Sequence, residues 1–143
     1  MGDLDKAAEA WENATIGISE PNIAMYYNDP QADMIFYQGL ASRKSGREAE
    51  ARSRFNKILK YGEKQLFVPF KMDYFAVSLP DLLIFEQDLQ KQHEQHCQYL
   101  MALGHAGLGD DTKAKAGFDK ILAEDPYHTD AIIHKKMVGK TLA

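Results

Sequence analysis

The chain has 143 residues, of which 45% are hydrophobic and 27% are charged, and its formal net charge is −4. This length suits one domain with a single core. The acidic balance gives no electrostatic reason to expect nucleic acid as a partner. No apolar run approaches the roughly 20 residues that span a bilayer, and residues 1–6 lack the basic start and apolar run of a secretory signal. Cys97 is the single cysteine, so no intrachain disulfide can form, and we expect a cytoplasmic protein without a membrane partner.

The first predicted element is a helix within residues 2–16. Its key residues are Gly2, Ala7, Trp11 and Ala14, whose glycine–alanine–aromatic spacing returns twice later in the chain. Only the second helix of the later unit is represented, so residues 2–16 are interpreted as half a repeat of a longer solenoid. Trp11 would then pack on an upstream helix or on another copy of the chain, which would allow a homo-oligomer.

Residues 32–64 form the first predicted helical hairpin. Helical spacing extends from Asp33 to Lys44 and stops at Gly46, because glycine can adopt the left-handed conformation that ends a helix. A second helix is predicted over residues 47–60. Its apolar stripe consists of Ala51, Phe55, Ile58 and Leu59. The short turn between the two helices makes them antiparallel.

Residues 65–90 fit neither hairpin and are predicted to be a helical insertion. Residues 71–77 favour a short helix that breaks before Pro80, and helical spacing resumes at Asp81 because proline suits a first helical turn. The segment is rich in aromatic and aliphatic residues. We therefore expect it to pack as a small core of its own.

The second hairpin is predicted over residues 91–128, and a capping helix over residues 129–143. The first helix of this hairpin begins near Leu89 and ends at Gly109, and the second ends before Pro126 because the residue that precedes proline avoids helical geometry. The capping helix would cover the hairpin and turn its lysines to solvent. These lysines are Lys135, Lys136 and Lys140.

One pattern occurs in both hairpins, 63 residues apart. The first copy is Gly46, Ala51, Phe55 and Lys57-Ile58-Leu59, and the second is Gly109, Ala114, Phe118 and Lys120-Ile121-Leu122. A repeated unit cannot bury its apolar face alone and must stack on a neighbour. We therefore expect an all-α solenoid that forms a single domain over residues 1–143.

These residues resemble the tetratricopeptide-repeat (TPR) family, whose unit is a helix-turn-helix of about 34 residues. Matches to the family pattern are Gly39, Ala51 and Phe55 in the first unit, and Ala102, Ala114, Phe118 and Pro126 in the second. Departures are Ile35, Ser42 and Glu63 in the first unit, and Gln98 and His105 in the second. With the insertion, the chain is similar to the C-terminal TPR region of certain large multi-domain bacterial proteins, whose upstream domains the resemblance connects with carbohydrates.

The resemblance implies that the first helix of each unit lines a concave groove. The residues expected to contact a partner there are Phe36, Leu40, Arg43, Lys44, Tyr99 and Leu103. Their aromatic and aliphatic side chains suit a bound peptide or helix. The insertion or the capping helix could instead cover this strip, and the sequence leaves that alternative open.

The sequence therefore favours a protein–protein interaction or scaffolding module that binds a protein or peptide. The first alternative is a structural or self-associating segment of a larger, carbohydrate-related bacterial protein. A carbohydrate-active enzyme is the remaining alternative, but the sequence shows no phosphate loop, nucleophile elbow or His-Glu-x-x-His motif. We expect neither catalytic activity nor a cofactor.

A metal site is the other chemistry that the sequence raises. The candidate ligands are His93, His96, Cys97 and His105. His93 and Cys97 are four residues apart and share a helix face, but a closed zinc site needs about four ligands, which the other histidines are not placed to complete. We expect no metal, and we interpret Cys97 as a small buried residue.

Overall fold

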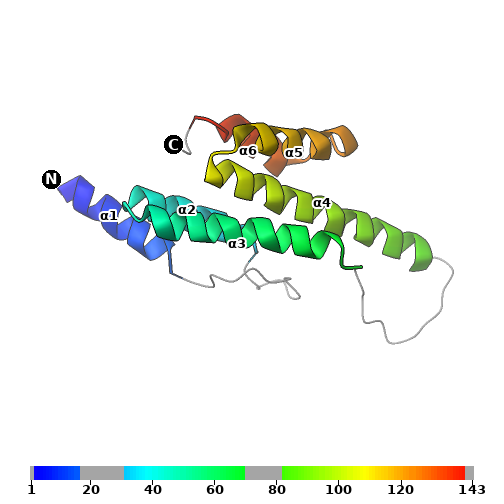
Figure 1. Ribbon diagram of the computed structural model, residues 1–143, viewed down its shortest axis with the longest axis horizontal. Coiled ribbons are helices and arrows are strands. Elements are labelled where there is room, and N and C mark those ends of the chain that lie inside the picture. The colour runs from blue at the N-terminus through cyan, green and yellow to red at the C-terminus, as the bar shows by residue number, and fades with distance from the viewer. Residues whose placement is uncertain (1, 17–30, 70–81, 141–143) are drawn as a thin grey trace.

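The computed structural model describes residues 2–16, 31–69 and 82–140, and these residues form helices and no strand (Figure 1). The helices are α1 (Gly2–Ala14), α2 (Met34–Lys44), α3 (Glu48–Leu66), α4 (Leu82–Leu108), α5 (Asp111–Glu124) and α6 (Thr129–Met137). The all-α prediction is confirmed for this part of the chain. None of these helices combines the length and hydropathy that a membrane crossing requires.

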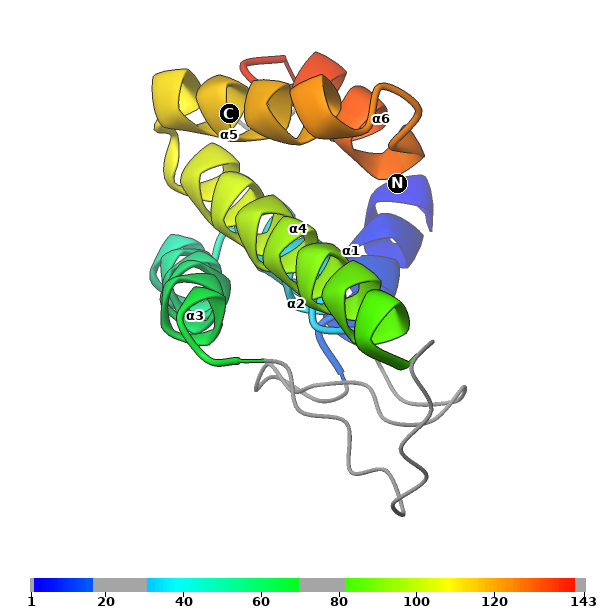
Figure 2. The same ribbon diagram turned by 90° about the vertical axis from the view of Figure 1, so that its right-hand side faces the viewer.

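The long helix α4 lies at the centre of the molecule (Figure 2). It packs against α2, α3 and α5, while α1 packs on α2 and α6 packs on α5. The pairs α2–α3 and α4–α5 are the two antiparallel hairpins that the sequence indicates, and α3 and α4 join one hairpin to the other.

Both hairpin turns have the same backbone geometry. Gly46 and Gly109 have φ angles of 77° and 86°, in the left-handed region that glycine adopts without strain. In each turn the next residue donates a backbone hydrogen bond to the carbonyl five positions earlier. These bonds are Arg47 N–H to Ser42 O at 2.8 Å and Asp110 N–H to His105 O at 2.9 Å. The bonds satisfy carbonyls at the helix end, which explains why α2 and α4 stop where the glycines predict.

The helices beside the predicted insertion are longer than the sequence suggested. Helix α3 continues to Leu66 instead of ending at Lys60, and α4 begins at Leu82 instead of near Leu89. The two stay in contact because Gly62 lies so close to α4 that an added Cβ would be 2.8 Å from the Cys97 carbonyl oxygen. The ends of the insertion therefore extend α3 and α4, and the predicted short helix over residues 71–77 lies outside the described residues.

The core of the first hairpin is built around one aromatic ring. Phe55 on α3 is fully buried, and its ring lies between Gly39 on α2 and Gly107 on α4. A Cβ added to Gly39 would be 2.5 Å from the ring, and one added to Gly107 would be 2.3 Å from it. The equivalent ring in the second hairpin, Phe118, is also fully buried and packs against Tyr99 with a centroid distance of 6.2 Å.

We predict that Gly39→Ala destabilises the protein, although an alanine for glycine exchange inside a helix ordinarily stabilises it by up to about 1 kcal/mol. The added methyl group would overlap the Phe55 ring, and such overpacking costs on the order of 1–3 kcal/mol. Urea unfolding of the two proteins measures the difference.

A double-mutant cycle identifies the cause of this loss. Phe55→Leu removes the ring atoms Cε1 and Cζ that the methyl group would meet, so Gly39→Ala should cost much less in that background. In the matched control background, Phe118→Leu, the cost of Gly39→Ala should persist. A neutral or stabilising effect of Gly39→Ala in the wild-type chain would contradict the packing described here.

Candidate functional site

The strip that the sequence assigns to partner binding is largely interior. Phe36, Tyr99 and Leu103 are at most 3% exposed and belong to the hydrophobic core. Leu40 is partly buried against the same core, and Lys44 is exposed at the end of α2. Of the two alternatives that the sequence left open, a free and a covered strip, the structure has the covered one. The side chains of Phe36, Tyr99 and Leu103, predicted to contact a partner, stabilise the fold instead.

Helix α6 covers the strip through His134, which is 4% exposed. The Nε2 atom of His134 lies 2.6 Å from the hydroxyl of Tyr37 on α2. Its Nδ1 atom lies 2.7 Å from the Asp130 carbonyl oxygen and 3.2 Å from the hydroxyl of Tyr99 on α4. A carbonyl can only accept, so Nδ1 carries a proton, and in the neutral imidazole Nε2 then accepts from the Tyr37 hydroxyl.

This hydrogen-bonded cluster fixes α6 across α2 and α4. The rings of Phe36 and Tyr99 meet the His134 ring edge-on, with centroid distances of 5.8 and 5.7 Å. Burial, reinforced by the Asp33 and Asp130 carboxylates, raises the pKa of both Tyr37 and Tyr99, so both phenols stay protonated at neutral pH. The sequence left open whether the groove is free or covered. Helix α6 covers it.

Arg43, another residue of the predicted strip, holds three helices together. Its guanidinium donates two hydrogen bonds to the Glu48 carboxylate on α3, at 2.8 and 2.9 Å, and one to the Gly107 carbonyl on α4, at 2.7 Å. It also lies 5.0 Å from the centre of the Phe55 ring. The hydrogen bonds from Arg43 lower the pKa of the Glu48 carboxyl. These contacts assign Arg43 to the fold.

On α4, the Cys97 thiol and the His93 ring contact each other, and His93 also contacts the end of α3. The Cys97 thiol lies 3.7 Å from His93 Nε2, and the same nitrogen lies 3.1 Å from the Gln65 carbonyl oxygen at the end of α3. Burial is the main cause that lowers the pKa of His96. Within the described residues, no three side chains of the ligand types His, Cys, Asp and Glu gather as a metal site would require.

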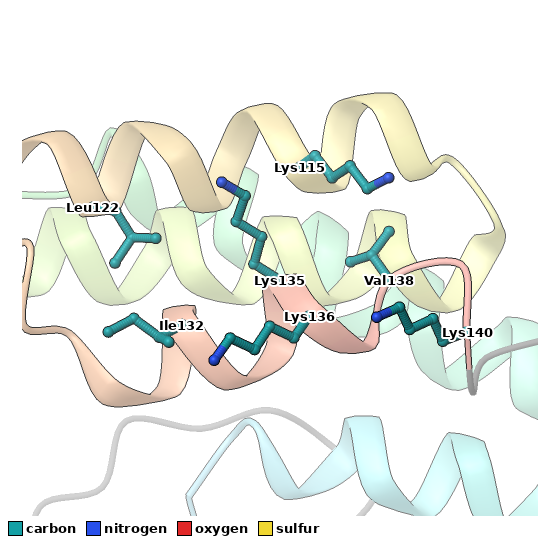
Figure 3. A pocket seen from close by; sticks show the side chains of 7 residues that line it. All are labelled: Lys115, Leu122, Ile132, Lys135, Lys136, Val138 and Lys140. Atoms are coloured by element: carbon teal, nitrogen blue, oxygen red, sulfur yellow. The ribbon is translucent and has the colours of Figure 1, made fainter.

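A cleft of about 410 Å³ between α5 and α6 combines an apolar floor with a basic rim (Figure 3). Three apolar residues and four lysines line it: Leu122, Ile132 and Val138, and Lys115, Lys135, Lys136 and Lys140. Figure 3 shows Leu122 of α5 and Ile132 of α6 on either side of the gap between the two helices. Val138 is buried beneath it, and Leu122 and Ile132 are partly exposed.

The rim carries four lysines, a local excess of positive charge in a chain with a net charge of −4. Lys135 forms an ion pair with Asp119 on α5, which joins the two helices across the cleft. Lys115, Lys136 and Lys140 are exposed. An anionic ligand with an apolar body would meet both features of the site, because carboxylates could reach the lysines while apolar groups cover the floor.

The sequence revealed the lysines but not the cleft. Lys135, Lys136 and Lys140 were predicted to be the solvated side of a capping helix, and they are at the surface. The available signal was Ile132, which stands three and four residues before Lys135 and Lys136 and therefore on the same helical face. A single apolar residue on a surface helix is common and does not by itself mark a binding face. The missing information was its position opposite Leu122 of α5, which depends on how α5 and α6 pack.

Comparison with known proteins gives no family assignment. No protein-family model matches the chain, and no solved structure matches it significantly. The fold and the α5–α6 cleft therefore carry the functional proposal.

We predict that the Cys97 thiol reacts much more slowly in the folded protein than in the unfolded chain. Burial raises the pKa of this thiol from 9.0 to about 11, and the side chain is 1% exposed, so the reactive thiolate is both scarce and covered. The rate of reaction with a chromogenic disulfide, measured from pH 7 to pH 10 with and without denaturant, should differ by at least about tenfold.

The same pKa shift makes stability depend on pH. Between pH 9 and about 11 the unfolded thiol loses its proton while the folded thiol keeps it, so the free energy of unfolding should fall as pH rises through this window. Cys97→Ala is the control, because it should remove this part of the decline. Equal reaction rates for folded and unfolded protein would contradict the buried position of Cys97.

Proposed function

We propose that the chain is a protein–protein interaction module with a TPR-like architecture, and that it binds an acidic amphipathic helix in the α5–α6 cleft. The observation that carries the proposal is the cleft itself, where an apolar floor is surrounded by four lysines. The proposal assigns the protein a binding role and no catalytic one. A cytoplasmic setting would suit its unpaired thiol, Cys97.

The TPR-like architecture is supported by the equivalence of the two hairpins. Their turns share a glycine with positive φ and the same hydrogen-bond pattern. The small residues Ala51 and Ala114 and the aromatic residues Phe55 and Phe118 are all fully buried at corresponding positions. Helices α3 and α4 pack one unit on the next, as stacked repeats require.

A helical ligand suits the cleft better than an extended peptide. Both walls are helices without a free sheet edge, so backbone pairing with an extended strand has no template there. An amphipathic helix can place an apolar face on Leu122 and Ile132 and carboxylates beside the lysines. Long-range attraction between the basic rim and an acidic helix would also speed association.

The alternative role, a structural or self-associating segment of a larger bacterial, carbohydrate-related protein, has one supporting observation. None of residues 3–14 of α1 is fully buried, and the Leu4 side chain is 75% exposed. An exposed leucine on a helix that packs on one neighbour leaves surface for a further contact.

The proposal predicts selective binding of helical acidic peptides. The probe is a fluorescent 14-residue peptide with glutamates on one helical face and leucines on the other, and the comparison is a scrambled peptide of the same composition. Fluorescence anisotropy should show binding of the first peptide alone, weakened by salt because surface charges are screened.

Charge reversal at the rim tests the site of binding. The double variant Lys136→Glu/Lys140→Glu should weaken binding at least about tenfold, since it replaces attraction by repulsion. Lys60→Glu, an exposed lysine on α3, is the matched control and should leave binding almost unchanged. Equal binding of both peptides, or unchanged binding by the double variant, would reject the cleft as the site.

A further inference from the structure

Helix α1 carries charges and apolar side chains that complement the α5–α6 cleft. It contains four acidic residues and one lysine, and it has no basic residue in its last turn. The exposed residues Leu4 and Ala8 are four apart and lie on one helical face, and Asp5 and Glu9 follow each of them by one position. The exposed side of α1 is therefore an apolar stripe bordered by carboxylates.

The acidic residues beside this stripe are available for a contact. Glu12 is engaged within the chain, since its carboxylate lies 3.1 Å from the Arg47 guanidinium. Asp5 and Glu9 are exposed and take part in none of the ion pairs between described residues. Trp11 and Ala7 are partly buried, whereas Leu4 and Ala8 are exposed, as are Ala10 and Ala14. Leu4 is the one large apolar side chain among these exposed residues.

The position of α1 directs this surface to another molecule. Its N-terminal end projects beyond the ends of α2 and α3, away from the α5–α6 pair (Figure 1). Among residues 2–16, 31–69 and 82–140, α1 packs mainly on α2, and the Glu12–Arg47 ion pair connects it to the start of α3. The acidic stripe and the basic cleft of one molecule are therefore separate surfaces.

We propose that α1 of one copy docks in the α5–α6 cleft of a second copy, so that the protein assembles head to tail. Leu4 would cover the apolar floor at Leu122 and Ile132, and Asp5 and Glu9 would face the exposed lysines of the rim. This inference rests on the proposed function, because it names the occupant of the same cleft. Donor and acceptor are different surfaces, so the contact is heterologous and produces open chains or closed rings, the smallest of which is a pair of copies that exchange α1.

The length of the donor agrees with the size of the acceptor. Helix α1 has 13 residues and α5 has 14, so the two helices are about 20 Å long and could lie side by side along the cleft. A contact of one helix with one cleft buries less area than a stable dimer requires, and it should be a weak association in the micromolar range or above. Assembly should therefore depend on protein concentration and decrease with salt.

Analytical ultracentrifugation of the full chain tests the proposal with two charge-reversed variants. The donor variant is Asp5→Lys/Glu9→Lys, and the acceptor variant is Lys136→Glu/Lys140→Glu. At concentrations on the order of 100 µM the wild-type chain should show an average mass above that of the monomer, and each variant alone should be monomeric. Circular dichroism verifies that both variants keep their helix content.

Mixing the variants separates a head-to-tail contact from other interfaces. In the mixture the native acidic α1 of the acceptor variant meets the intact basic cleft of the donor variant, and the basic α1 of the donor variant meets the acidic cleft of the acceptor variant. Both contacts are attractive, so two variants that are monomeric alone should assemble when they are mixed. A chain with all four substitutions should assemble again, because attraction is restored with opposite signs. Leu4→Ser should weaken assembly without changing stability, since the leucine is 75% exposed in the single chain.

Three results would overturn the inference: a wild-type chain that is monomeric at these concentrations, assembly that persists in the acceptor variant, or variants that do not associate when mixed. Failure of the proposed function is recognised separately with the acidic helical peptide. The donor variant has an intact cleft. If it binds the peptide while any of these three results is found, the chain remains an interaction module but α1 is not its ligand. An absence of peptide binding as well would remove both.

Discussion

The insertion of the Phe55 ring between two glycines is the contact on which the rest of the structure depends. Gly39 and Gly107 allow α2 and α4 to approach this ring more closely than any residue with a Cβ could. The Arg43 guanidinium lies over the same ring and bonds to Glu48 and to the Gly107 carbonyl, so it holds α2, α3 and α4 together. One aromatic side chain and one arginine thus fix how the first hairpin stacks on α4.

This stacking decides which surfaces remain for binding. With α2 and α4 held at this distance, Tyr37 and Tyr99 both reach His134 of α6, and the three side chains fill the space above Phe36. The residues that were expected to line a groove, Phe36, Tyr99 and Leu103, therefore belong to the hydrophobic core. A partly exposed apolar surface with lysines around it lies instead where α6 meets α5, at Leu122 and Ile132.

The hairpins could be predicted from the sequence because their signals are local. Gly46 and Gly109 mark the turns, and the stripe of Ala51 and Phe55 marks the buried side of α3 whatever the distant residues do. The burial of Tyr99 could not be read in this way, since it requires His134, which is 35 residues away on a separate helix. The lengths of α3 and α4 were underestimated for the same reason, as Gly62 gains its role from contact with Cys97 and Met101.

The two proposed occupants of the α5–α6 cleft would exclude one another. An external acidic helix and α1 of a second copy would need the same lysines and the same apolar floor. Each would therefore lower the apparent affinity of the other, and the coupling would be equal in both directions. At high protein concentration, the clefts would be occupied by α1 of other copies. A partner with a more complete apolar face than Leu4 and Ala8 would displace α1 from the cleft. The separation of charge along the chain, acidic at α1 and basic at the cleft, then serves both interactions.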